Sequence, residues 1–152
     1  MQKISPFLWF DGQAEEALTF YASVFENSRV TNVSRGPDGT AMSATADLDG
    51  LSVMAFNAGP QHKFNEAVSF MVPCETQEDV DRLWGLLTAD GGEESQCGWL
   101  KDKYGLSWQI VPNALGELLG DPDPARANGA LQAMLKMSKI DIAGLKAGAD
   151  AA

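Results

Sequence analysis

The sequence predicts an α+β protein made of two tandem βαβββ modules followed by a C-terminal helical tail. Three observations predict this class. Short apolar runs end at clusters of Gly, Pro, Asp and Asn, which is typical of strands. In each half, one helical pattern of apolar residues, repeating every three or four positions, follows the first of these runs. The order of strand, helix and three strands then occurs twice, in copies of roughly fifty residues.

The first module begins with a short apolar and aromatic run, Ile4 to Phe10, which ends at Asp11-Gly12 and predicts a buried strand. From Gln13, apolar residues recur at helical spacing through Phe25, which predicts a helix of about fourteen residues. Turn residues then separate three further predicted strands: Arg29–Arg35, Ala41–Leu48 and Leu51–Phe56.

The second module repeats this order after a polar loop. Ala67 to Val72 predicts a buried strand, and Thr76 with Asp79 resembles the capping box that starts a helix. The apolar stripe of that helix stops at Gly91-Gly92. Three short predicted strands follow: Glu93–Gln96, Trp99–Asp102 and Ser107–Val111.

The composition changes to helix formers after Pro112. Asp123 is placed to cap a helix whose first position is Pro124. We expect this tail to have no core of its own and to pack on the domain or on a dimer partner, with Ala147–Ala152 frayed. The predicted division is therefore one domain, residues 1–112 with modules of about 1–58 and 66–112, and a helical extension, residues 113–152.

Composition and charge exclude several classes of partner. Eleven basic against twenty-one acidic residues give a net charge of −10 and a pI near 4.4, so the protein repels nucleic acid and anionic membrane surfaces. The sequence shows no apolar run of membrane-spanning length and no signal peptide at its start, which predicts a cytoplasmic protein. Cys74 and Cys97 match no metal or redox spacing and are expected to be reduced.

Several separated motifs carry a family resemblance. Phe10-Asp-Gly-Gln-Ala-Glu-Glu-Ala-Leu-Thr-Phe-Tyr, within a tandem βαβββ pattern, resembles the vicinal oxygen chelate superfamily of glyoxalase I, bleomycin-resistance proteins and extradiol dioxygenases. Further motifs resemble its PhnB-like branch, which is labelled 3-demethylubiquinone-9 3-methyltransferase: Ala67-Val-Ser-Phe-Met-Val, Cys97-Gly-Trp-Leu-Lys-Asp-Lys-Tyr-Gly-Leu-Ser-Trp-Gln-Ile-Val-Pro and Met134-Leu-Lys-Met-Ser-Lys-Ile-Asp-Ile. The resemblance, which extends to Leu145, implies a curled mixed sheet around a cleft and a homodimer.

Metal-dependent relatives carry His or Glu ligands on the first and last strand of each module. The resemblance places those positions at or next to Pro6, Val53, Val68 or Ser69, and Gln109. A neutral amide is a weak ligand for a divalent ion and needs carboxylate or imidazole companions. We therefore expect no metal and no other cofactor. The single histidine, His62, lies in a polar loop and is interpreted as solvated or loop-stabilising.

The positive signal is a set of aromatic and uncharged polar residues on or beside predicted strands. These residues are as compatible with a filled core as with a ligand pocket. Its candidate residues are Phe10, Asn57, Ser69, Cys97, Trp99, Trp108 and Gln109. Asp102 is interpreted as capping the turn before Gly105, and both cysteines as apolar fillers unless the Cys97 thiol faces a cleft near Lys101. No catalytic residue is identified.

Three functions remain open at this point. The first is a metal-independent protein that binds a small apolar or aromatic molecule. The second is an enzyme of the same fold, in its most specific form the methyltransferase of the family label, although the chain lacks the Gly-rich turn between a strand and a helix that adenosylmethionine sites commonly use. The third is a structural or regulatory dimer whose cleft is filled by side chains.

Overall fold

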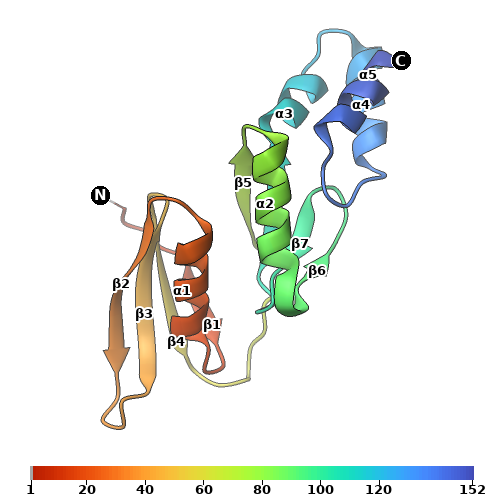
Figure 1. Cartoon of the computed structure of the whole chain (residues 1–152). Coiled ribbons are helices and arrows are strands. Elements are labelled where there is room, and N and C mark those ends of the chain that lie inside the picture. The colour runs from red at the N-terminus through yellow and green to blue at the C-terminus, as the bar shows by residue number, and fades with distance from the viewer. Residues whose placement is uncertain (1) are drawn as a thin grey trace. The chain divides into compact units, whose positions relative to one another are not determined.

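A computed structural model describes residues 2–152 (Figure 1). The chain divides into two compact units, one ending at Lys63 and the other spanning Phe64–Ala152, and each is described by itself. The first contains β1 (Phe7–Phe10), α1 (Ala14–Val24), β2 (Ser28–Arg35), β3 (Ala41–Leu48) and β4 (Leu51–Asn57). The second contains β5 (Ser69–Cys74), α2 (Gln77–Thr88), η1 (Ala89–Gly91), β6 (Glu93–Glu94), β7 (Trp99–Lys101), β8 (Ser107–Pro112), α3 (Asn113–Leu119), α4 (Pro124–Met134) and α5 (Ile142–Asp150).

The two units repeat one sheet topology. The strand order is β1-β4-β3-β2 in the first sheet and β5-β8-β7-β6 in the second, and in each sheet the first pair is parallel while the other pairs are antiparallel. A parallel pair needs a crossover connection, and α1 or α2 supplies the helix in it. The predicted α+β class with two tandem βαβββ modules is confirmed.

In the first unit, α1 covers one face of the sheet (Figure 1). Leu18 and Tyr21 of the helix are fully buried, as are Ala46 and Val53 of the sheet. Side chains alternate between the two faces of a strand, so the remaining strand positions, such as Met54 and Phe56, lie on the face opposite α1. That opposite face is the relevant one for the site.

The second unit buries the corresponding face of its sheet under α2. Helix residues Val80, Leu83 and Leu87 pack against strand residues Leu100 and Ile110, and all five are at most 4% exposed. The predicted capping box is confirmed at its first bond, because the Thr76 hydroxyl accepts a hydrogen bond of 3.1 Å from the Asp79 backbone N–H. Alternation again places the odd-numbered residues of β7 and β8 on the face opposite α2.

The helical tail belongs to the second unit and builds a small apolar cluster. Leu115, Ile140 and Leu145 are its buried residues, and partly buried Val111, Leu118, Met134 and Met137 pack against them. The tail is tied to the sheet by backbone hydrogen bonds of 2.8 Å from Cys97 N–H to the Met137 carbonyl and from Gly98 N–H to the Ser138 carbonyl. The cluster thus joins the tail to β8 through Val111, and the tail packs on its own unit. Asp123 does cap α4, with Pro124 at its start.

Several element boundaries differ from the prediction, among them the end of β6, which lies at Glu94 rather than Gln96. The first strand begins at Phe7 rather than Ile4, whose side chain is 88% exposed, and β5 is displaced toward Cys74. The prediction that Ala147–Ala152 frays was wrong for most of that segment. Helix α5 continues to Asp150, because Ala149 is fully buried and the Asp150 carboxylate pairs with Arg126 at 2.8 Å.

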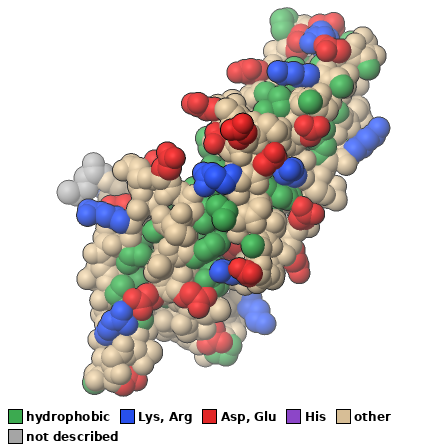
Figure 2. Space-filling model, viewed as in Figure 1, with side chains coloured by type: hydrophobic (Ala, Val, Ile, Leu, Met, Phe, Trp, Pro, Cys, Tyr) green, Lys and Arg blue, Asp and Glu red, His purple; other side chains and the backbone are tan. Residues whose placement is uncertain are grey.

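The surface is predominantly acidic in the part of the chain that is described, with Asp and Glu side chains spread over both units (Figure 2). Among residues 2–152, no helix is both long and apolar enough to cross a membrane.

Candidate functional site

The first sheet carries a row of aromatic rings in edge-to-face contact on the face opposite α1. Phe7 and Trp9 of β1 each meet Phe56 of β4 edge-on, with ring centroids 4.8 and 5.1 Å apart, and Trp9 meets the ring of His62 at 4.6 Å. The cross-strand register explains the row, because Trp9 lies opposite Phe56 and Phe7 lies opposite Met54. Phe7 is 53% exposed and Met54 39% exposed, so this row is an accessible apolar wall.

His62 is therefore part of that wall. It packs against Trp9, whose indole N–H in turn donates a 2.9 Å hydrogen bond to the carbonyl of Gly59 in the same loop. The interpretation of His62 as a residue that stabilises its loop agrees with this contact.

Two residues predicted to line a pocket lie elsewhere in the first unit. Phe10 is only 3% exposed, within the core. Asn57 accepts a 2.9 Å hydrogen bond from the Ala14 backbone N–H and donates one of 3.0 Å to the Ala41 carbonyl. Its amide thus joins the start of α1 to β3, which is a structural role.

The second sheet presents a polar row on the face opposite α2. The Gln109 side-chain N–H donates a 2.9 Å hydrogen bond to the Ser69 hydroxyl, which joins β8 to β5. Trp99 of β7 lies directly opposite Gln109, and Met71 of β5 flanks it on the other side. The structure thus brings together three of the predicted site residues: Ser69, Trp99 and Gln109.

A second polar row lies next to the first, and of its members sequence reasoning named only Ser69 as a candidate pocket residue. Cross-strand register aligns Glu93, Lys101, Ser107 and Ser69 across the four strands. The Lys101 ammonium pairs with the Glu66 carboxylate, from the segment before β5. A signal for this row exists in the sequence, because Ser107 lies two residues before Gln109 and strand alternation places both on one face. Extending the row to the neighbouring strands requires knowledge of the register.

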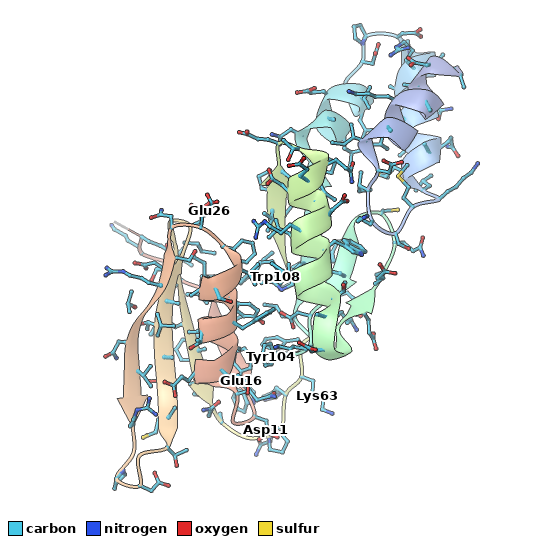
Figure 3. All side chains as sticks on the ribbon, in the orientation of Figure 1. Asp11, Glu16, Glu26, Lys63, Tyr104 and Trp108 are labelled. Atoms are coloured by element: carbon cyan, nitrogen blue, oxygen red, sulfur yellow. The ribbon has the colours of Figure 1, made fainter. Side chains whose placement is uncertain are left out.

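Trp108 lies on the other face of the sheet, although the sequence placed it with Gln109. It is 2% exposed, meets Phe70 edge-on at 5.3 Å and donates its indole N–H to the Asp102 carboxylate at 2.9 Å. Adjacent residues of a strand point to opposite faces, so Trp108 and Gln109 cannot both line one wall. Trp108 and Tyr104 can be followed in Figure 3, and both belong to the second unit.

Neither cysteine joins these polar rows. Cys74 is 3% exposed, and burial raises the pKa of its thiol to about 11, which disfavours the nucleophilic thiolate. Cys97 is half-buried with a φ of 60°, and its backbone N–H holds the tail through Met137. The structure thus gives Cys97 a role in the loop that precedes Trp99.

The positions that the family resemblance aligns with metal ligands offer an unsuitable donor set. Val53 is an alkyl side chain buried under α1, Pro6 has no side-chain donor, and Gln109 presents an amide already bonded to the Ser69 hydroxyl. Divalent ions of the relevant kinds prefer carboxylate or imidazole ligands. Within residues 2–152, no group of three or more His, Cys, Asp or Glu side chains is placed to hold a metal ion.

Comparisons with known proteins agree with this architecture. A sequence model of the family described as 3-demethylubiquinone-9 3-methyltransferase matches residues 2–111. A solved structure described as a putative 3-demethylubiquinone-9 3-methyltransferase, PhnB protein, from Bacillus cereus is 36% identical, with a TM-score of 0.68, over 73% of this chain and 99% of that one. A comparison with curated proteins finds no match.

More distant solved structures share the fold alone. A protein from Pseudomonas aeruginosa, PA1353, is 17% identical, with a TM-score of 0.62, over 74% of this chain and 98% of that one. The fosfomycin resistance protein FosX from Listeria monocytogenes is 14% identical, with a TM-score of 0.58, over 79% of this chain and 98% of that one. The family match ends at residue 111, so α3, α4 and α5 lie outside the matched segment.

Proposed function

The chain belongs to the family described as 3-demethylubiquinone-9 3-methyltransferase, with the fold of the vicinal oxygen chelate superfamily, and from this premise we propose that it binds a small apolar or aromatic molecule without a divalent metal. The observation that carries the proposal is the pairing of Gln109 with Ser69 beside Trp99 on the face opposite α2. Small-molecule sites combine apolar or aromatic walls with a few fixed polar groups, and this arrangement supplies both.

The aromatic row of the first unit supports the same class of ligand. Phe7, Trp9 and Phe56 present ring faces and edges. A flat apolar molecule makes favourable contacts with such rings, and its binding costs the protein little side-chain entropy. The rings hold one another in place through their edge contacts, so this wall is already formed before a ligand arrives.

Methyl transfer, the reaction in the family description, is not part of the proposal. Adenosylmethionine is commonly bound where a strand leads through a Gly-rich turn into a helix of a doubly wound parallel sheet. Each sheet of this protein has a single parallel pair, and β1 leads to α1 through Asp11-Gly12-Gln13. An enzyme of another reaction type would use the same face of the sheet, opposite α2. In the polar rows described above, no nucleophilic side chain is paired with a base.

The proposal predicts that the Gln109 amide anchors the ligand. We expect benzyl alcohol, indole or 1-naphthol to raise the melting temperature of the protein, because a ligand that binds only the folded state stabilises it. Gln109→Leu keeps a similar side-chain volume but removes the amide, and should weaken binding about tenfold, the value of one lost hydrogen bond. Differential scanning fluorimetry across a concentration series measures both.

A matched control is Gln132→Leu, the same change at an exposed position of α4. It should leave the ligand-induced shift in melting temperature unchanged. If none of the three ring compounds stabilises the unmodified protein, the proposed binding function is wrong. If Gln132→Leu weakens binding as much as Gln109→Leu does, Gln109 is not an anchor.

The metal-independent part of the proposal has its own measurement. Protein purified without chelators and dialysed against metal-free buffer should contain far less than one zinc, nickel, manganese or iron ion per chain by elemental analysis. The reason is the donor set, because one amide and alkyl groups do not replace a carboxylate or imidazole at the family positions. Stoichiometric metal that is lost in Gln109→Leu would contradict this part.

A further inference from the structure

The second unit contains a hollow of about 150 Å³ at the edge of its sheet. It is lined from β6, β7 and β8 and from the segment before β5, and its members are Glu66, Glu93, Glu94, Ser95, Trp99, Leu100, Lys101 and Ser107. At about 30 Å³ per water molecule, this volume corresponds to roughly five waters, enough for the polar end of a small molecule. The hollow adjoins Gln109, because Trp99 lies opposite that residue in the register.

Ser107 places a buried hydroxyl group at this hollow. Its side chain is fully buried, and among the described residues its hydroxyl has no hydrogen-bond partner. A buried hydroxyl without a partner destabilises the folded state, so such a group is expected where a ligand or another group satisfies it. Ser107 lines the hollow, directly opposite Lys101.

The charges around the hollow indicate what kind of partner fits. The Lys101 ammonium is engaged by Glu66 and faces Glu93 across the strands, and these carboxylates raise the pKa of Lys101, first through the hydrogen bond to Glu66. Glu94 turns its carboxylate to α2, where it accepts a 2.6 Å hydrogen bond from the indole N–H of Trp84. Two carboxylates therefore surround one ammonium, which leaves a net negative charge.

The hydrogen-bond acceptors at the hollow favour the same kind of partner. One of the two N–H groups of the Gln109 amide is donated to Ser69, and the amide oxygen is an acceptor on this face. The Ser107 hydroxyl can also accept a hydrogen bond, and the carboxylates of Glu66 and Glu93 can only accept, so the hollow offers several acceptors. An entering group that donates hydrogen bonds and carries positive charge fits both these acceptors and the net negative charge.

We infer that the ligand of this face is a small apolar or aromatic amine, bound as an ammonium whose N–H groups reach Ser107 and the carboxylates of Glu66 and Glu93 while its apolar part lies against Trp99. This inference rests on the proposed function and specifies its ligand class. The indole of Trp99 adds to it, because aromatic faces attract cations.

Three probes of nearly equal size test the charge preference. Benzylammonium, benzyl alcohol and benzoate differ in the group attached to one ring, and isothermal titration calorimetry at 150 mM salt would give their dissociation constants. We expect benzylammonium to bind about tenfold more tightly than benzyl alcohol, and benzoate to bind more weakly than either, because of the net negative charge of the hollow. If no probe binds, the proposed function itself fails. If benzyl alcohol or benzoate binds as well as benzylammonium, only the amine inference fails.

Ser107→Ala separates a binding role from a structural one. Removing an unpartnered buried hydroxyl should raise the melting temperature of the free protein and, at the same time, weaken benzylammonium binding about fivefold to tenfold. A residue that only supports the fold would not move these quantities in opposite directions. Unchanged affinity for benzylammonium in Ser107→Ala overturns the assignment.

Glu93→Gln and Glu117→Gln make a charge-matched pair. Both remove one negative charge from an exposed position, but only Glu93 lines the hollow, whereas Glu117 lies on α3. We expect about threefold to tenfold weaker benzylammonium binding for Glu93→Gln and no change for Glu117→Gln. Equal losses in the two variants would mean that the overall charge of −10, rather than the hollow, attracts the cation.

Discussion

Replacing Asp102 with alanine is expected to lower the free energy of unfolding of the second unit by about 3–5 kcal/mol, because it removes the charged acceptor of three N–H groups at once. The carboxylate is only 2% exposed. One oxygen accepts the backbone N–H groups of Tyr104 and Leu106 at 2.8 and 3.1 Å, and the other accepts the indole N–H of Trp108 at 2.9 Å. Urea unfolding followed by tryptophan fluorescence measures the change.

Two further variants identify the cause of that loss. Asp38→Ala makes the same change in the hairpin between β2 and β3, where the exposed carboxylate accepts hydrogen bonds from Thr40, and it should cost much less than Asp102→Ala. Trp108→Phe removes the indole donor, so Asp102→Ala should cost less in that background than in the unmodified protein. Equal costs for Asp102→Ala and Asp38→Ala would show that burial of the network does not matter.

Asp102 also illustrates what sequence could establish. An aspartate directly before Lys103-Tyr104-Gly105 has few roles other than accepting N–H groups of the turn, so its capping role followed from local chemistry and is confirmed by its bonds to Tyr104 and Leu106. The repeated βαβββ order could also be predicted from local sequence. The hydrophobic period and the turn residues identify each helix or strand without knowledge of which elements pack against it.

Sequence reasoning could not predict which residues lie together on one face of each sheet. Which residues share a face depends on strand register, and a shift of one residue exchanges the two faces. The sequence therefore grouped Trp108 with Gln109, whereas the structure separates them, and it did not single out Ser107, which alternation places beside Gln109. The partner of the Ser69 hydroxyl lies 40 positions away, a distance over which periodicity carries no information.

Replacing Gly129 with alanine should be the most damaging small change in the tail. Gly129 of α4 lies against α5, and a methyl group added there would meet backbone atoms, the carbonyl of Gly148 and the Cα of Ala149, rather than side chains that could rotate away. We expect a loss of about 2–4 kcal/mol in the free energy of unfolding, because two helices would have to separate. Hydrogen exchange of α5 and thermal unfolding would both register it.

Helix propensity predicts the opposite sign for this change, which makes its comparison with Gly85→Ala informative. In a helix interior alanine is favoured over glycine by about 1 kcal/mol, and a methyl group at Gly85, in the middle of α2, meets no atom within 4 Å. Gly85→Ala should therefore stabilise the protein, while Gly129→Ala destabilises it. If both substitutions stabilise, α4 and α5 do not pack backbone to backbone, and the small residues of the tail are there for some other reason. If the signs differ as expected, the close approach of Gly129 to Gly148 explains why Ala149 is fully buried within the segment, Ala147–Ala152, that was predicted to fray.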